Sequence, residues 1–258
     1  MWEHPILDHS LISARYFFPR PTAHQNAFAV ETEAGTLACW RSPSAGSRPL
    51  LLHFHGNGEV AGDYLPEFAA LLDSWGWDLL LAEYRGYGDS DGRPALAGML
   101  RDIPALVNAS GVPPESIVVF GRSVGSIYAI EAAARYPKLA GLVLESGIAD
   151  VGQRVRLRVT PEELGCTEEE LTQALQEHLD HRAKLQSFDG PALLLHAEHD
   201  HLVSIAHAEQ NFAWLQSSER ERMVRLVRLP HGDHNSIMHT NQREYLRELH
   251  HFLERAIP

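Results

Sequence analysis

The sequence predicts an α/β fold in which a mainly parallel sheet carries helices on both faces. Short apolar runs that end in glycine or polar residues alternate with segments of helical apolar spacing. The 258 residues include 44% hydrophobic side chains, enough for a large buried core, and 22% charged side chains. Neither an internal repeat nor a linker interrupts the chain, so we expect one domain over residues 1–258.

Eight segments are expected to form strands. Two short ones, Phe28–Val30 and Thr36–Trp40, are joined by E-T-E-A-G and predict a hairpin, so the sheet should start antiparallel. In the last of these segments, Met223–Leu229, apolar and basic residues alternate, as in a strand near the sheet edge. The six longer runs are Leu50–Phe54, Trp77–Ala82, Ile117–Phe120, Leu139–Leu144, Ala192–Leu195 and Met223–Leu229.

Five segments between these strands have the apolar spacing of helices. In the second of them Pro104 predicts a kink or a late start, and Pro137 is a stop signal after the third. The segments are Tyr64–Trp75, Leu96–Val107, Val124–Tyr136, Ile205–Leu215 and Gln242–Leu253.

Residues 147–187 do not fit the alternation, because they are too long and too polar for one crossover helix. T-P-E-E (Thr160–Glu163) and T-E-E-E-L from Thr167 are both typical of helix starts. We therefore expect a small helical insertion, or lid. The alternative is an ordinary crossover with an irregular surface loop.

The charge and the cysteines limit the function classes. A net charge of −12 argues against nucleic acid or anionic lipid as a partner, although Gln153 to Arg158 holds three arginines at alternate positions. Cys39 and Cys166 lie far apart and are expected to be free thiols. Neither a signal-peptide core nor a run of membrane-spanning length is visible, which favours a cytoplasmic protein.

The pentad G-R-S-V-G at 121–125 stands between a predicted strand and a predicted helix. A serine on such a sharp turn is exposed for attack, and a helix N-terminus is aimed at the reacting carbonyl. Gly121 and Gly125 then flank Ser123 because a Cβ at either position would collide with neighbouring backbone. Taken alone, the pentad also fits an ordinary strand-to-helix turn.

A nucleophilic serine of this kind requires an acid after a later strand and then a histidine nearer the C-terminus. Asp200 follows the strand A-L-L-L-H-A, and His234 follows the last strand in L-P-H-G-D-H-N-S. Glu198 competes with Asp200, but the spacing from the strand favours Asp200. Asp233 is expected to point away from His234, and His231 to be a loop residue.

Five motifs together resemble the α/β-hydrolase superfamily over about residues 10 to 258. They are H-F-H-G-N-G, Y-R-G-Y-G-D-S-D-G, G-R-S-V-G, H-A-E-H-D-H-L-V and G-D-H-N. The chain is similar to α/β-hydrolase-domain proteins that act on acyl esters and thioesters. The resemblance implies the roles that the residues already suggest: Ser123 as nucleophile, His234 as general base and Asp200 as the acid that orients it.

An oxyanion hole should combine two backbone N–H groups. One belongs to Val124, directly after the nucleophile, and the resemblance places the other at Asn57 in H-G-N-G. Gly56 is expected to allow the sharp turn there, and Gly58 to let the loop approach substrate. The alternative is that H-G-N-G is only a tight turn. In the next motif Tyr84, Arg85 and Asp89 are expected to hold loops together.

We therefore predict a serine hydrolase that cleaves a small-molecule acyl ester or thioester through an acyl-enzyme, with no metal or organic cofactor. The alanine-rich helix after Ser123 and the small insertion suggest an apolar wall for a medium-chain acyl group. Sixteen histidines, including those in H-A-E-H-D-H (196–201), raise a metal hypothesis, but they lack metal-ligand spacing.

Three alternatives use the same scaffold. Acidic residues in the insertion (Glu162, Glu163 and Glu168–Glu170) could hold the N-terminus of a peptide, which would make the chain an aminopeptidase. A C–C bond hydrolase would use the same three residues. A non-catalytic small-molecule-binding protein would keep the pocket without the chemistry, since fold alone does not decide function.

Overall fold

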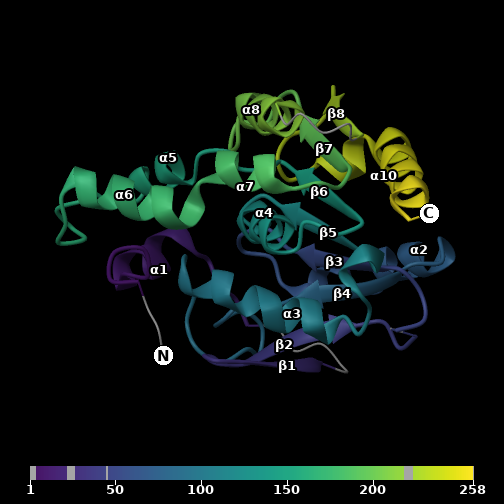
Figure 1. Cartoon of the computed structure of the whole chain (residues 1–258), viewed down its shortest axis with the longest axis horizontal. Helices are drawn as coiled ribbons and strands as arrows, with labels where there is room; N and C mark the ends of the chain where they lie inside the picture. Colours follow the sequence, from purple (N-terminus) through teal and green to yellow (C-terminus); the bar gives the residue numbers. More distant parts are fainter. Residues whose placement is uncertain (1–3, 22–26, 45, 218–222, 258) are drawn as a thin grey trace.

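A computed structural model describes residues 4–21, 27–44, 46–217 and 223–257, and its centre is an eight-stranded sheet (Figure 1). The strand order is β1-β2-β4-β3-β5-β6-β7-β8. Strands β1 and β2 pair antiparallel, β2 also pairs antiparallel with β4, and all other neighbours are parallel. The strands are β1 Phe28–Thr32, β2 Gly35–Arg41, β3 Leu50–Phe54, β4 Asp78–Ala82, β5 Ile117–Arg122, β6 Gly141–Glu145, β7 Ala192–Ala197 and β8 Val224–Leu229.

The burial of the strands explains their composition. Every residue of β3 to β7 is buried, because helices cover both faces of the parallel part, and these strands are accordingly near-continuous runs of Leu, Val and Ala. Strand β8 stands at one end of the sheet and alternates buried and exposed positions, as its sequence predicts. The predicted fold, including the antiparallel N-terminal hairpin, is confirmed.

Helices α2 and α10 cover one face of the sheet, and α3, α4, α7 and α8 cover the other (Figure 1). Each face has its own apolar core: Phe68 and Leu249 belong to the first, Leu106 and Ile127 to the second. The helices are α1 Ser10–Tyr16, α2 Glu67–Ser74, α3 Ile103–Ala109, α4 Gly125–Arg135, α5 Val151–Arg156, α6 Glu168–Leu179, α7 His181–Ser187, α8 Ile205–Gln216, α9 Ile237–Thr240 and α10 Gln242–Ala256.

Three short 3-10 helices accompany them: η1 Ala61–Tyr64, η2 Gly98–Asp102 and η3 Pro114–Ser116. The late start predicted from Pro104 is confirmed, since η2 precedes α3 and Pro104 lies in the first turn of α3, where its missing N–H costs nothing. Helix α1 has no counterpart among the predicted elements. Its seven residues make only about two helical turns, too few for a repeating apolar stripe to stand out in the sequence.

The insertion at 147–187 is helical and comprises α5, α6 and α7. Thr167 starts α6 with a reciprocal cap, in which its side chain accepts from the Glu170 N–H. The helix start expected at Thr160–Glu163 is wrong. Thr160 and Glu163 form the same pair of contacts, but Gly165 then takes a left-handed conformation (φ +69°) and residues 160–166 remain a turn.

Two further features concern the whole chain. Cys39 is buried, Cys166 is partly buried, and both are free thiols, as predicted. Over the described ranges, no helix is both long enough and apolar enough to cross a lipid bilayer.

Candidate active site

The turn between β5 and α4 holds Ser123 in a strained conformation. Its φ of +51° lies in the left-handed region, which non-glycine residues rarely adopt. A Cβ on Gly121 would lie 2.6 Å from the Ala129 Cβ, and one on Gly125 would collide with the carbonyl oxygens of Phe54 and His55. The two glycines therefore permit the close backbone approach that the pentad predicts.

Ser123, His234 and Asp200 come from three separate loops and meet at the carboxyl edge of the sheet. The Ser123 Oγ lies 2.9 Å from the His234 Nε2, and the His234 Nδ1 lies 2.7 Å from an Asp200 carboxylate oxygen. An ionised carboxylate can only accept, so Nδ1 carries the proton and Nε2 is left to accept from the serine hydroxyl. All three residues are at least nine-tenths buried.

The Asp200 carboxylate is held on both oxygens. One accepts from the backbone N–H groups of Leu202 (2.9 Å) and Val203 (2.8 Å), and the other faces His234. Burial alone would raise the pKa of Asp200, but the hydrogen bond and charge of His234 and the Val203 N–H hold it below its usual value. The acid therefore stays ionised and keeps the imidazole in one tautomer.

The competing residues stay apart from this arrangement. Glu198 is exposed and makes no contact with His234 in the described structure. Asp233 is also exposed and turns away, accepting from the backbone N–H groups of Asn235 and Ser236. His231 is an exposed loop residue.

The loop after β3 brings Asn57 to the same cavity as Ser123 and Val124. Its side-chain amide is engaged elsewhere, donating to the Tyr16 carbonyl (2.6 Å) and accepting from the Phe18 N–H (2.9 Å). No described residue accepts a hydrogen bond from the backbone N–H of Asn57 or of Val124. Both groups are thus available as donors, as an oxyanion hole requires.

The sharp turn of this loop is formed by a different glycine from the one expected. Gly58, not Gly56, has the left-handed conformation of the turn (φ +77°). Gly56 lacks a side chain because Arg122 and Glu59 pack against it, with a Glu59 carboxylate oxygen 2.7 Å from where its Cβ would be. The sharp turn therefore depends on Gly58. The absence of a side chain at Gly56 leaves room for Arg122 and Glu59, which belong to a polar cluster.

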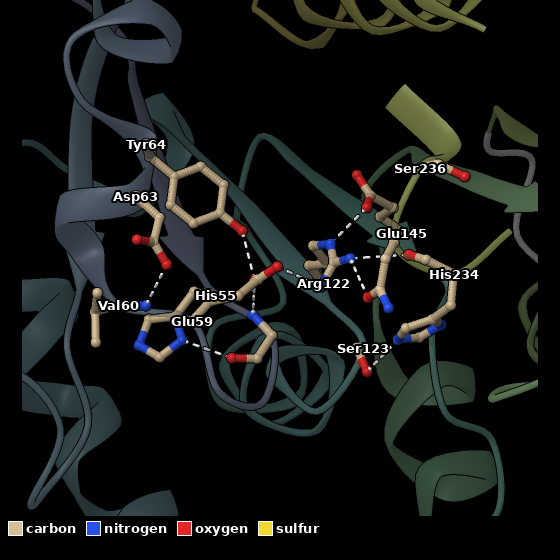
Figure 2. Close-up of polar contacts among 12 residues, drawn as sticks. His55, Glu59, Val60, Asp63, Tyr64, Arg122, Ser123, Glu145, His234 and Ser236 are labelled. Carbon is tan, nitrogen blue, oxygen red and sulfur yellow. Dashed lines mark hydrogen bonds and ion pairs between the residues drawn. The ribbon is translucent and has the colours of Figure 1, made fainter. Parts of the chain in front are cut away.

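That cluster is centred on Arg122, the second residue of the pentad, and sequence reasoning missed it (Figure 2). The guanidinium lies between two carboxylates, 2.6 Å from Glu59 and 2.9 Å from Glu145. It also donates to the backbone carbonyl of His234 (2.8 Å), while Glu59 accepts from the Gly56 N–H (2.6 Å). One side chain thereby connects the loops that carry Ser123, His234 and Asn57.

Two tyrosines complete the Arg122 cluster. The Tyr64 hydroxyl donates to Glu59 (2.8 Å), and the Tyr245 hydroxyl donates to Glu145. Burial raises the pKa of Glu145, although the neighbouring Arg122 and the Tyr245 hydroxyl act to lower it. Two members of the cluster stand out in the sequence: Arg122, the charged residue inside the pentad, and Glu145, the acid that ends the apolar run of β6. Neither position indicates which residue its side chain contacts.

Two cavities lie on either side of Arg122 and share it as a wall. The one that contains Ser123 and His234, the serine cavity, has a volume of about 220 Å³. The other, of about 260 Å³, is lined by Glu59, Glu145, aromatic side chains and residues of α9. The alanine-rich part of α4 lines neither, since its side chains are buried in the core, so the apolar wall expected from it is wrong.

The remaining motifs are structural. Arg85 donates to both carboxylate oxygens of buried Asp102 (2.7 and 2.6 Å), and the Tyr84 hydroxyl donates to the His55 carbonyl (2.7 Å). Both residues hold loops together, as expected. In the part of the chain that the structure covers, no three His, Cys, Asp or Glu side chains gather in a way that could hold a metal ion.

Comparison with known protein sequences agrees with this architecture. The family model described as serine aminopeptidase, S33, matches residues 45–168. An uncharacterized protein of Mycobacterium tuberculosis is 33% identical over 216 residues, covering 79% of this chain and 71% of that protein. The α/β-hydrolase domain-containing protein 17C of Xenopus laevis is 29% identical over 238 residues, covering 90% of this chain and 70% of that protein.

Solved structures show the same fold at low sequence identity. An esterase of Pyrococcus furiosus superposes with a TM-score of 0.70 at 17% identity, covering 92% of this chain and 98% of that one. A monoacylglycerol lipase of Paleococcus ferrophilus gives 0.62 at 16% identity, covering 85% and 99%. The sheet topology, the strained turn at Ser123 and the similar proteins together indicate that this protein is of the α/β-hydrolase class. The chain belongs to the α/β-hydrolase superfamily.

Proposed function

We propose that this chain hydrolyses carboxylic esters or thioesters through an acyl-enzyme formed on Ser123. The observation that carries the proposal is the continuous contact from Ser123 through His234 to Asp200, at 2.9 and 2.7 Å. A serine hydroxyl is a poor nucleophile by itself, and an imidazole oriented by a carboxylate is the base that activates it.

In the first half-reaction the Ser123 Oγ attacks the carbonyl carbon while its proton passes to the His234 Nε2. The carbonyl π electrons become an oxyanion, which accepts from the N–H groups of Asn57 and Val124. Collapse of this intermediate breaks the bond to the alcohol or thiol, and His234 returns the proton to that leaving group. Asp200 remains ionised and stabilises the imidazolium throughout.

In the second half-reaction water takes the place of the leaving group. His234 removes a proton from the water, which attacks the acyl carbonyl and regenerates the same oxyanion. Expulsion of the Ser123 Oγ, with the proton returned from His234, releases the carboxylic acid. The loss of one oxyanion donor in other enzymes costs about 10²–10³ in rate, which sets the scale for the Asn57 and Val124 N–H groups.

The aminopeptidase alternative has less support in this chain. Of the acidic residues that suggested it, Glu163 bonds Arg15, Glu168 bonds Arg156, and Glu170 caps α6. Among the described residues that line the serine cavity none is acidic, whereas a peptide ammonium group would require an anionic partner there.

The test is labelling with a fluorophosphonate probe, followed by turnover of p-nitrophenyl esters of increasing chain length. We expect the wild type to be labelled and to hydrolyse the esters, and Ser123→Ala to lose both. Turnover by Ser123→Ala should fall at least about 10³-fold, as in other triads whose nucleophile is removed.

Ser126→Ala is the matched control, because Ser126 belongs to the same turn but its hydroxyl donates to the Ser123 carbonyl (2.6 Å) and does not face His234. It should retain the labelled band. A wild type that neither reacts with the probe nor turns over any ester, while circular dichroism shows it folded, would refute the proposal and favour a binding protein. Ester turnover that persists in Ser123→Ala would refute the assignment of the nucleophile.

A further inference from the structure

The serine cavity has a charge opposite to that of the protein. The chain as a whole carries 34 acidic and 22 basic side chains, yet the cavity lining includes Arg154 and Arg158 beside Ser123 and His234. Arg154 lies on α5 and Arg158 in the turn that follows it, both within the helical insertion. The insertion thus supplies positive charge directly to the reaction centre.

Neither of these arginines forms an ion pair with a residue that the structure describes. The Arg158 guanidinium lies 5.6 Å from the centre of the Phe18 ring and is exposed, and Arg154 is partly buried. Asp150, one turn before Arg154, uses a carboxylate oxygen to cap α5 through the Gln153 N–H (2.8 Å). The two cations therefore have donors to offer to a bound molecule.

Arg156, between them in the sequence, shows the contrast. It points to the other side of α5, bonds Glu168 and Thr172, and lines a different cavity. The alternate arginines thus separate into one that is neutralised within the insertion and two that line the serine cavity without an ion-pair partner among the described residues. The pattern in Gln153–Arg158 is consistent with a ligand that provides the missing negative charge.

The rim of the serine cavity is apolar as well as cationic. Phe18 and Leu202 line it and are 48% and 53% exposed, among the few large apolar side chains on the described surface. A molecule that fits this rim has an apolar part against Phe18 and Leu202 and an anionic group within reach of the arginines. A cavity of about 220 Å³ keeps these parts within a few bonds of the reacting carbonyl.

We propose that Arg154 and Arg158 form an anion subsite, and that the preferred substrate is a small ester or thioester bearing a carboxylate or phosphate group. This inference rests on the proposed function for its substrate class, although the subsite can be tested by binding alone. The anion can be on either side of the scissile bond: in the acyl group, which stays on Ser123, or in the alcohol or thiol that leaves.

The first experiment compares matched substrates. On the acyl side, p-nitrophenyl hemisuccinate is set against p-nitrophenyl valerate, which replaces the carboxylate by an ethyl group. On the leaving-group side, 4-acetoxybenzoate is set against its methyl ester. The ratio of kcat/KM between each anionic ester and its neutral partner is measured for the wild type, Arg154→Gln, Arg158→Gln and the double variant.

We expect the ratio to fall about 10-fold for each arginine lost in at least one arm, because hydrogen bonds to charged groups are worth more than neutral ones. The pair of esters whose ratio falls shows whether the preferred substrate carries its anion in the acyl group or in the leaving group. Turnover of the neutral esters should change less than about 3-fold. Arg156→Gln, the matched control, should leave both ratios as in the wild type. Raising the salt concentration should reduce the ratio of the wild type, since partly exposed charges are screened.

If kcat/KM falls equally for anionic and neutral esters, or if the ratio is unchanged in the double variant, the anion subsite is refuted. The proposed ester hydrolysis is unaffected by either result. If no ester is turned over at all, the proposed function fails, and the anion subsite is then tested by ligand binding. Calorimetric titration of phenyl phosphate and of succinate into Ser123→Ala protein should then show binding that Arg154→Gln or Arg158→Gln weakens. Absence of binding by both anions at 10 mM, a high concentration on the affinity scale, would refute it.

Discussion

The three arginines that line the serine cavity have opposite surroundings. Arg122 is buried between Glu59 and Glu145 and uses its donors on protein acceptors, including the His234 carbonyl (Figure 2). Arg154 and Arg158, which come from the helical insertion, line the serine cavity without a carboxylate partner among the described residues. The same residue type thus has its donors occupied by protein acceptors at Arg122 and has donors available at Arg154 and Arg158.

The difference indicates what each arginine contributes. A buried cation between two anions has a large desolvation cost that only its partners offset, so it fixes geometry and has little capacity left for a ligand. A partly exposed cation without a partner keeps its solvation and contributes little to folding. Arg122 should therefore matter for stability and alignment, and Arg154 for the choice of substrate.

The largest effect expected from this comparison is on stability. Arg122→Met leaves Glu59 and Glu145 without their cation, and loss of one partner from a buried ion pair costs about 3–5 kcal/mol. Arg154→Met removes no described ion pair and should change the free energy of unfolding by less than about 0.5 kcal/mol. Urea denaturation of the two variants beside the wild type measures both values.

A triple variant separates charge from packing at the Arg122 site. Glu59→Gln and Glu145→Gln, added to Arg122→Met, remove the uncompensated charges and should recover part of the stability that Arg122→Met loses. If Arg122→Met and Arg154→Met unfold at the same urea concentration, the two environments do not differ in energy and the comparison fails. The triple variant also covers the case in which Arg122→Met does not fold.

The next effect is on catalysis through the loop after β3. Glu59 accepts from the Gly56 N–H and bonds Arg122, so it fixes the backbone next to Asn57. Glu59→Ala should lower kcat for a neutral ester about 10-fold with a smaller change in KM, since misplacing an oxyanion donor costs less than the 10²–10³ of losing it. Steady-state kinetics with p-nitrophenyl butyrate measures this.

Asp63→Ala is the control for Glu59→Ala. Asp63 lies on the same segment and accepts from the Val60 N–H (3.1 Å), but it does not bond Arg122. It should change kcat less than about 3-fold. Equal losses in the two variants would mean that general disorder of the segment, and not the link to Arg122, lowers the rate.

The sequence predicted the strands, the serine turn and its two partners because each depends on local patterns. An apolar run followed by G-R-S-V-G, an acid shortly after β7 and a histidine after β8 can be read from the sequence, although Glu198 competed with Asp200 there. The left-handed φ of Ser123 follows from the same pentad. Since each of the three residues follows the carboxyl end of a parallel strand, all three lie at the same edge of the sheet.

The Arg122 cluster could not be predicted in this way. Its partners come from the loop after β3, the end of β6 and α10, and only the packed sheet brings these segments together. The role of Gly56 follows from that cluster, not from the turn in which it lies. At Arg154 and Arg158 the alternate spacing was visible, but the direction of each side chain depends on how α5 lies over the serine cavity.

The smallest expected effect is a shift in the pKa of His207. It tests whether the charge of Arg154 is uncompensated, as the comparison with Arg122 requires. Burial lowers the pKa of His207, and Arg154 lowers it further, while Asp150 opposes both. Arg154→Gln should therefore raise the pKa of His207 toward its ordinary value, and Arg156→Gln should leave it unchanged. An NMR pH titration, with the His207 signal assigned from a His207→Gln variant, measures the shift. If the pKa of His207 does not move in Arg154→Gln, another group neutralises Arg154, and the contrast between Arg122 and Arg154 disappears.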